Sequence, residues 1–218
     1  MNHATRLNRF HETDLYVVIT EAFCAGRSSE EILDAALTAG VRLIQFREKD
    51  MPDGERHRRA EAFRKKTADA EALLIVNDRV DIALAVNADG VHLGQGDLPP
   101  KIARDIVPEL LIGVSTHNRA QAEAAQEAGA SYVNIGPIFP TQTKAVTAEA
   151  LGPAAIAEIA PHLSIPFTCM GGIKADNIEQ VLRHGARHPA VVTAVTAQPD
   201  PEQAARELRD RIGQARRT

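Results

Sequence analysis

The chain contains little of what several protein classes require. Only two cysteines occur, Cys24 and Cys169, which excludes a disulfide framework and a cysteine-rich zinc site. No run approaches the roughly 18 consecutive apolar residues of a membrane helix, and the first fourteen residues lack the apolar core of a secretory signal. We therefore expect reduced thiols and a cytoplasmic protein that does not bind membranes.

Aromatic residues and excess positive charge are also scarce. Tryptophan is absent, aromatic residues make up 4% of the 218 residues, and 25 Lys and Arg face 29 Asp and Glu, a formal net charge of −4. Because base-stacking platforms and a basic surface are both poorly supplied, nucleic acid is not the expected partner. The basic run at residues 56–66 has helical patterning, which favours an exposed helix face over an RNA site.

Eight short apolar segments alternate with amphipathic segments along the chain. The predicted strands span residues 15–20, 41–46, 73–77, 90–93, 111–115, 132–136, 166–170 and 190–195. This leaves about 27 residues per repeat, close to the roughly 30 of a strand–helix unit in a parallel sheet. We predict an α/β protein with a single (β/α)8 TIM barrel over residues 15–218 and an N-terminal extension, residues 1–14, without an expected function. A doubly wound open sheet is the alternative.

Glycines and a capping pattern predict where several helices begin and end. Ser28 followed by Glu31 is typical of a capping box, in which each side chain bonds the other residue's backbone. Gly40, Gly129 and Gly185 each follow an amphipathic segment, as C-terminal glycines do.

The first candidate functional cluster follows the second predicted strand. Because side chains alternate along a strand, Gln45, Arg47 and Lys49 share one face and point to the end of the barrel where barrel enzymes bind substrates. Two cations held there require carboxylates or an anionic ligand. An internal salt-bridge network is the alternative.

Carboxylates follow the next two predicted strands. Asn77 and Asp78 come directly after one strand, and Asp97 lies in the loop after the next. Two carboxylates at one rim of a barrel, together with substrate phosphate oxygens, suit Mg²⁺. The alternative for Asp78 is an N-cap of the following helix.

Hydroxyl groups and glycines follow the last three predicted strands. Thr141, Thr143 and Lys144 lie in a long loop, residues 137–151, that is typical of a lid or of a mobile surface loop. Gly171 and Gly172 follow the seventh strand and Val192 and Thr193 end the eighth, where barrels often bind phosphate. The glycine pair is equally compatible with a simple turn.

Taken in order, the segments QFREK, NDRVDIALAVNADGVHLGQGDLP, GVSTHN, YVNIGPIFPTQTK, GGI and VVTAV resemble the thiamine phosphate synthase family over nearly the whole chain. The resemblance implies a magnesium-dependent transferase of thiamine biosynthesis on a (β/α)8 barrel. Such an enzyme joins hydroxymethylpyrimidine diphosphate to hydroxyethylthiazole phosphate by a dissociative substitution and releases pyrophosphate.

The resemblance also implies roles for individual residues. The implied pyrimidine diphosphate ligands are Gln45, Phe46, Arg47, Glu48, Lys49, Asn77, Ser115 and Lys144. The implied catalytic residues among them are Arg47, Lys49, Ser115 and Lys144. The implied thiazole phosphate ligands are Thr141, Gln142, Thr143, Gly172, Val192 and Thr193. Asp78 and Asp97 match the magnesium ligands of the family.

Two other functions stay open. A thiazole tautomerase-like barrel shares the fold and the thiazole phosphate pocket, but it has no diphosphate to bind, so Arg47, Lys49, Asp78 and Asp97 together favour the transferase. A non-catalytic barrel that binds a phosphorylated ligand is the other. The expected partners are two small phosphorylated substrates, and assembly into a homo-oligomer is left open.

Overall fold

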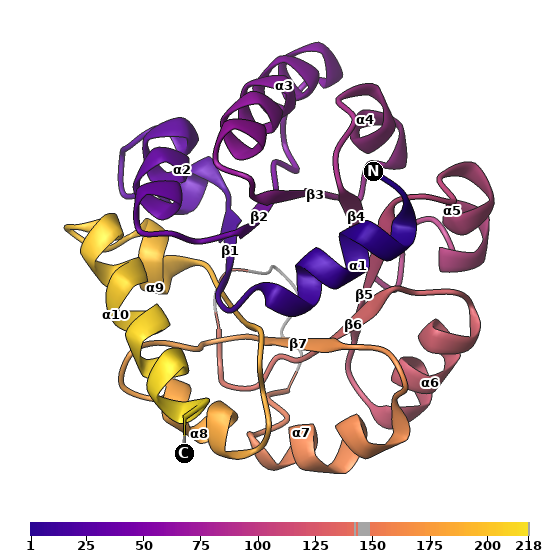
Figure 1. Ribbon diagram of the computed structural model, residues 1–218, viewed down its shortest axis with the longest axis vertical. Coiled ribbons are helices and arrows are strands. Elements are labelled where there is room, and N and C mark those ends of the chain that lie inside the picture. The colour runs from indigo at the N-terminus through magenta and orange to yellow at the C-terminus, as the bar shows by residue number, and fades with distance from the viewer. Residues whose placement is uncertain (142, 144–148, 218) are drawn as a thin grey trace.

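The computed structural model of the protein describes residues 1–141, 143 and 149–217. Its parallel strands β1 to β8 form a closed barrel in chain order, with helices around the outside (Figure 1). The predicted (β/α)8 TIM barrel is therefore confirmed. The alternative of an open sheet is wrong, because β8 pairs with β1 and closes the sheet.

The strands match the predicted segments closely, with ends that differ by no more than two residues except at β8. The strands are β1 Tyr16–Ile19, β2 Leu43–Phe46, β3 Leu73–Asn77, β4 Gly90–Leu93, β5 Leu111–Thr116, β6 Tyr132–Ile135, β7 Phe167–Met170 and β8 Pro189–Val191. The α-helices are α1 His3–Glu12, α2 Ser29–Thr38, α3 Asp53–Asp69, α4 Val80–Ala85, α5 Pro100–Ile106, α6 Arg119–Glu127, α7 Ala154–Ile159, α8 Ile178–Arg183, α9 Thr193–Thr196 and α10 Pro201–Ala215. Two short 3₁₀ turns, η1 Glu21–Phe23 and η2 Ala160–His162, complete the described elements.

The eighth predicted strand differs most from the structure. The pattern predicts a strand over residues 190–195, whereas β8 ends at Val191 and the chain turns into the short helix α9. The backbone N–H of Thr196 donates to the Val192 carbonyl at 3.0 Å, which closes a helical turn. A short apolar run fits a buried strand or a buried helical turn. Here Thr196 Oγ1 donates to the Phe23 carbonyl at 2.6 Å and favours the turn.

The predicted helix boundaries are confirmed where the sequence carries clear signals. Ser28 and Glu31 form the reciprocal capping box at the start of α2. Gly40, Gly129 and Gly185 each adopt the left-handed backbone that follows a helix C-terminus. The basic run, residues 56–66, lies within α3 on the outside of the barrel, as predicted.

Alternating side chains divide the buried residues into two layers. One face of each strand packs against the surrounding helices, as Phe46 does against Phe63 of α3. The other face fills the barrel interior, where Tyr16, Leu43 and Tyr132 are fully buried. Side chains on the interior face at the C-terminal ends of the strands therefore lie at the mouth of the barrel, where ligands can reach them.

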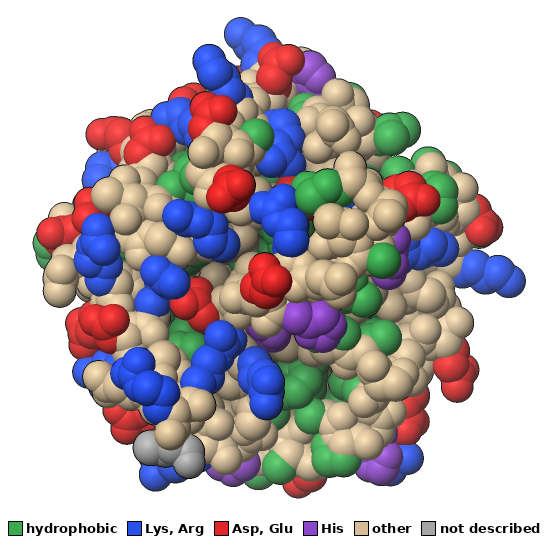
Figure 2. All heavy atoms as spheres, viewed as in Figure 1, with side chains coloured by type: hydrophobic (Ala, Val, Ile, Leu, Met, Phe, Trp, Pro, Cys, Tyr) green, Lys and Arg blue, Asp and Glu red, His purple; other side chains and the backbone are tan. Residues whose placement is uncertain are grey.

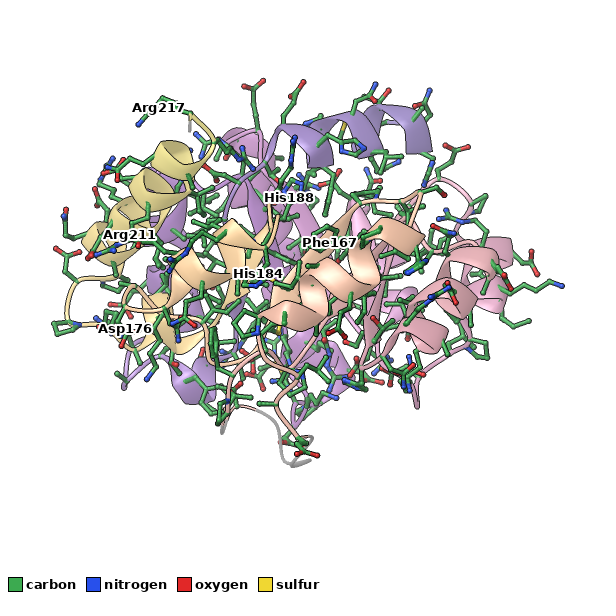
Figure 3. The ribbon with its side chains drawn as sticks, turned by 90° about the horizontal axis from the view of Figure 1, so that it is seen from below. Phe167, Asp176, His184, His188, Arg211 and Arg217 are labelled. Carbon is green, nitrogen blue, oxygen red and sulfur yellow. The ribbon has the colours of Figure 1, made fainter. Side chains whose placement is uncertain are left out.

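Helix α1 covers the N-terminal end of the barrel. Phe10 is fully buried among the interior residues, and its ring stacks on Tyr132 with a centroid distance of 4.7 Å. Figure 3 shows α1 along one end of the barrel, with the loops that follow the strands at the opposite end. Residues 3–12 are thus part of the barrel's core packing, which the sequence did not predict.

The face around α1 carries charged side chains of both signs (Figure 2). Near the end of α10, arginines bind the chain around α1 and β1. Arg209 Nε donates to Asp14 Oδ2 at 2.9 Å, and Arg216 donates to the carbonyls of Thr13 and Arg187.

Within the described part of the chain, no helix is long and apolar enough to cross a bilayer.

Candidate active site

Two adjoining cavities occupy the C-terminal end of the barrel. The larger has a volume of about 610 Å³ and the smaller about 60 Å³. The described residues that line both are Thr143, Met170 and Val192. The larger is also lined by Phe23, Pro140, Thr141, Gly171, Gly172, Ile173, Lys174, Ala190, Val191 and Thr193. The smaller is also lined by Val18, Gln45, Arg47, Lys49, Asn77, Asp78, His92, Gly94, Asp97 and Ser115.

Strand β2 delivers its polar side chains to the smaller cavity, as the alternation predicts. Gln45 is 1% exposed and its amide donates to the Tyr16 hydroxyl at 2.6 Å. Arg47 follows the strand and donates to Thr20 Oγ1 at 3.2 Å. Burial lowers the pKa of the Arg47 guanidinium, and the Asp78 carboxylate opposes that shift. A partly desolvated cation of this kind gains from an anion in the cavity.

Lys49 pairs with a carboxylate from the neighbouring strand. Its Nζ lies 3.0 Å from Asp78 Oδ2, and its side chain is 51% exposed. The alternative of internal salt bridges therefore holds for Lys49, although the exposed half of its side chain still faces solvent at the mouth.

The two candidate metal ligands, Asp78 and Asp97, line the same cavity. Burial raises the pKa of the Asp78 carboxyl, and a hydrogen bond with Asp97 adds to the shift while Lys49 opposes it. Asp97 Oδ2 accepts from the Gly94 N–H at 2.6 Å. Two carboxylates that line one cavity favour a cation between them.

The backbone holds Asp78 in an uncommon conformation. Its φ is +61°, in the left-handed region, and its N–H donates to the His92 carbonyl at 2.8 Å. The residue at the N-cap of α4 is Arg79, so the N-cap alternative for Asp78 is wrong. Left-handed non-glycine residues carry strain that is often found at functional sites.

Buried hydrogen bonds connect the walls of the smaller cavity across the barrel interior. The Tyr132 hydroxyl lies 3.1 Å from the Tyr16 hydroxyl and 3.1 Å from His92 Nδ1. His92 Nε2 lies 2.9 Å from Ser115 Oγ, and Tyr16 accepts the bond from Gln45. His92 is therefore a wall residue with a hydrogen-bond partner at each ring nitrogen.

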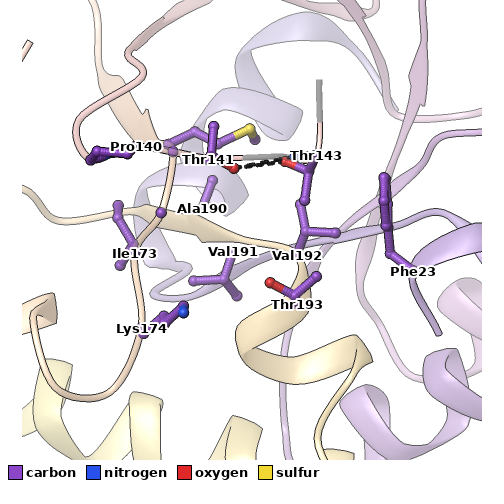
Figure 4. Close-up of a pocket in the computed structure, with 13 residues that line it drawn as sticks. Phe23, Pro140, Thr141, Thr143, Ile173, Lys174, Ala190, Val191, Val192 and Thr193 are labelled. Atoms are coloured by element: carbon purple, nitrogen blue, oxygen red, sulfur yellow. Dashed lines mark hydrogen bonds between the residues drawn. The ribbon is translucent and has the colours of Figure 1, made fainter. Parts of the chain in front are cut away.

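The larger cavity lies between the ends of β7 and β8 and the loop after β6 (Figure 4). Thr141 Oγ1 and Thr143 Oγ1 are 3.1 Å apart at its rim. Gly172 has a φ of +61°, and a Cβ there would lie 2.5 Å from the Pro140 carbonyl oxygen. Glycine is therefore required for the loops after β6 and β7 to approach each other.

Some predicted site residues do not reach either cavity. Phe46 is 1% exposed and packs on Phe63, so its side chain points away from the barrel mouth. Glu48 Oε1 accepts from the Glu21 N–H at 2.8 Å, and burial raises the pKa of the Glu48 carboxyl. Gln142 and Lys144 lie outside the described residues.

Other residues line the cavities without having been predicted as ligands. Lys174 lines the larger cavity and directly follows the Gly-Gly-Ile segment. Its place next to a predicted phosphate-binding segment could have marked it as a candidate ligand from the sequence. Phe23 comes from η1 after β1, a segment with no motif that would mark it.

Neither cysteine suits a catalytic role. Cys24 and Cys169 are fully buried, and burial raises the pKa of both thiols, to about 11 for Cys24. Cys169 lies within β7 and packs in the hydrophobic core. Among the described residues, no group of three or more His, Cys, Asp or Glu could hold a metal ion, so a metal at Asp78 and Asp97 would draw its other ligands from elsewhere.

A family model described as thiamine monophosphate synthase matches residues 15–195, which include both cavities. The chain belongs to this family. A thiamine-phosphate synthase of Lawsonia intracellularis is 41% identical over 202 residues, 92% of this chain and 93% of the relative. A thiamine-phosphate synthase of Chloroflexus aurantiacus is 44% identical over 195 residues, 89% of this chain and 90% of the relative.

Solved structures support the same family. The thiamine phosphate pyrophosphorylase of Pyrococcus furiosus superposes with a TM-score of 0.88 at 35% identity, covering 94% of this chain and 97% of that chain. A 3-hexulose-6-phosphate synthase has a TM-score of 0.68 at 20% identity, covering 91% of this chain and 99% of that one. The second likeness shows the shared barrel fold alone.

Proposed function

We propose that the two adjoining cavities form the active site of a thiamine phosphate synthase. Membership of the family makes the chain a transferase that joins hydroxymethylpyrimidine diphosphate to hydroxyethylthiazole phosphate and releases pyrophosphate. The observation that carries the proposal is the junction of a charged cavity with a larger cavity through Thr143, Met170 and Val192. Two substrates bound side by side would meet at this junction.

The smaller, charged cavity is proposed for the pyrimidine diphosphate. Arg47 and Lys49 supply cations, while Gln45, Asn77 and Ser115 supply neutral polar groups on the same walls. Lys144 completes this set in the proposal by its place in the sequence. The larger cavity is proposed for the thiazole phosphate, with its described ligands at Thr141, Thr143, Gly172, Val192 and Thr193, and with Gln142 beside them in sequence.

Asp78 and Asp97 would hold a divalent cation, proposed to be Mg²⁺. Their fit rests on two carboxylates that line one cavity, where burial and the neighbouring Asp97 raise the pKa of Asp78. When bound, the cation would neutralise diphosphate charge as a Lewis acid. Lys49, now paired with Asp78, can turn from that carboxylate to a phosphate oxygen because its side chain is half exposed.

The reaction needs no nucleophile from the protein. The bond between the pyrimidine methylene carbon and the diphosphate oxygen breaks, and the thiazole ring nitrogen forms a bond to the same carbon. Arg47 and Lys49 stabilise the negative charge that develops on the leaving diphosphate. The two cavities hold the ring nitrogen near that carbon, which lowers the entropic cost of the encounter.

The test is an incubation with both substrates and Mg²⁺, in which thiamine phosphate and pyrophosphate are measured together. Equal amounts of the two products, absent when either substrate is omitted, are expected. A thiazole tautomerase would instead isomerise its thiazole substrate without the pyrimidine, and a binding protein would bind ligand without forming product. Either result would reject the proposal.

A further inference from the structure

The walls of the larger cavity contain one charged side chain among the described residues. That residue is Lys174, since the other described lining residues are apolar, glycine or threonine. The smaller cavity instead balances Arg47 and Lys49 against Asp78 and Asp97. The described lining of the larger cavity thus has a net positive charge, whereas that of the smaller is neutral.

Lys174 lies where its ammonium can reach a ligand. It follows β7 in the loop after Gly172. In Figure 4 its side-chain nitrogen points towards Val191, another lining residue. The structure shows no ion pair for this ammonium within its described residues. Asp176, two residues further along, is exposed and is not among the lining residues; it is labelled in Figure 3.

One side chain closes the turn that carries Lys174. Asn177 Oδ1 accepts from the Lys174 backbone N–H at 2.8 Å, and Asn177 Nδ2 donates to the Gly172 carbonyl at 2.9 Å. Both ends of the amide are therefore used within one turn. Because Gly172 is also held closely against Pro140, the backbone on either side of Lys174 has little freedom.

We infer that Lys174 is a phosphate-binding residue of the larger cavity, and that Asn177 is a positioning residue that holds Lys174 and Gly172 in one turn. The inference rests on the proposed function, in which this cavity takes the thiazole phosphate. A phosphate monoester carries close to two negative charges near pH 7, and threonine hydroxyls and backbone groups supply no countercharge. Lysine binds such a group as a point charge.

The inference is tested with two ligands that differ only in the phosphate. Hydroxyethylthiazole phosphate and its unphosphorylated alcohol are titrated into wild type, Lys174→Gln and the surface control Lys101→Gln. Lys174→Gln should bind the phosphate about tenfold more weakly than wild type. The variant loses a charge-assisted contact, whose strength is limited because the lysine is exposed to solvent. Binding of the alcohol and the behaviour of Lys101→Gln should match wild type.

Steady-state kinetics with the complete enzyme give the second readout. Lys174→Gln should raise KM for the thiazole phosphate by about tenfold. KM for the pyrimidine diphosphate should stay at the wild-type value. Added salt should weaken phosphate binding in wild type more than in Lys174→Gln, because screening acts on the charge that the variant lacks.

Asn177→Ala separates positioning from folding. Its KM for the thiazole phosphate should rise while its melting temperature and its KM for the pyrimidine diphosphate stay near wild type. Asn177→Ser, which keeps an acceptor and a donor on a shorter side chain, should restore part of the loss. A fall in melting temperature with both KM values raised equally would reject the positioning role.

Different experimental results would reject the inference about Lys174 and the proposed function. If wild type makes no thiamine phosphate and does not bind the thiazole phosphate, the proposed function is wrong. If wild type is active but Lys174→Gln binds the phosphate and the alcohol as wild type does, the inference about Lys174 is overturned while the proposed function stands.

Discussion

The ammonium of Lys49 lies 3.0 Å from the Asp78 carboxylate, so a cation following β2 and an anion following β3 hold each other at the mouth of the barrel. Together with Arg47 and Asp97, the pair leaves the described lining of the smaller cavity with no net charge before a ligand enters. Because Asp97 lines the same cavity and contributes to the raised pKa of Asp78, removal of the Asp78 carboxylate would disturb a cation, a carboxylate and the proposed metal position together.

Asp78→Ala is therefore expected to lower turnover by about a hundredfold or more, on the scale of losing one preorganised electrostatic contact. The measurement is the rate of pyrophosphate release at saturating substrates over a range of Mg²⁺ concentrations. Asp105→Ala on the outer helix α5 serves as the matched control and should behave as wild type. Near-normal rates for Asp78→Ala at saturating Mg²⁺ would contradict the assignment.

Tyr132→Phe tests the buried hydrogen bonds between the walls of the smaller cavity. The change removes the hydroxyl that lies within hydrogen-bonding distance of both the Tyr16 hydroxyl and His92 Nδ1. We expect a loss of about 1–3 kcal/mol in the free energy of unfolding. Because the chain of bonds ends at Gln45 and Ser115, KM for the pyrimidine diphosphate should also rise severalfold. An unchanged KM for both substrates would show that the bonds serve stability alone.

Phe10→Ala tests whether α1 is part of the folding unit. Phe10 is fully buried against Tyr132, so its truncation should lower the free energy of unfolding by about 3–5 kcal/mol. Urea denaturation measures this loss. Since α1 lies at the end of the barrel opposite the cavities, kcat of the folded variant should stay near wild type. Destabilisation below 1 kcal/mol would show that residues 3–12 only lie on the surface of the barrel.

His188 makes stability depend on pH. Burial, with the nearby positive charges of Arg216, His11 and Arg187, lowers the pKa of His188 from 6.5 to about 3. The folded protein therefore keeps His188 neutral while the unfolded chain takes up a proton below pH 6.5. The free energy of unfolding therefore carries no cost from His188 above pH 6.5, and it decreases as the pH falls from 6.5 towards 3.

At pH 5 the loss should be about 2 kcal/mol, from 1.4 kcal/mol for each pH unit below the unfolded pKa. Urea denaturation at pH 7 and pH 5 measures it. His188→Asn should remove most of this difference, whereas His57→Asn on the outer helix α3 should keep it. An equal pH dependence in wild type and His188→Asn would reject the linkage.

Much of the site follows from local rules of sequence. The eight apolar segments predicted the barrel, because each strand buries both faces and each amphipathic segment buries one. Alternation along β2 predicted that Gln45, Arg47 and Lys49 share a face, and the positions of Asp78 and Asp97 after successive strands predicted that they meet. These predictions needed only the period of a strand and the rule that parallel strands end at one rim.

Other features depend on contacts between distant segments, which no local pattern contains. Alternation along β2 places Phe46 on the face opposite Gln45, but its packing partner, Phe63 of α3, is a contact that no local pattern contains. The end of β8 was missed because a short apolar run suits a strand or a helical turn. Lys174 became a candidate only when folding placed it in a cavity with no other described charge.

By itself the sequence determined the barrel, its strand order and the rim where the polar groups gather, since periodicity and strand direction are properties of neighbouring residues. Only the tertiary structure decided that α1 closes the opposite end, that Tyr132 links Tyr16 with His92, and that Asn177 holds the turn of Lys174. Those relationships join residues through space, and their free energy comes from burial and hydrogen bonds that exist only once the barrel has closed.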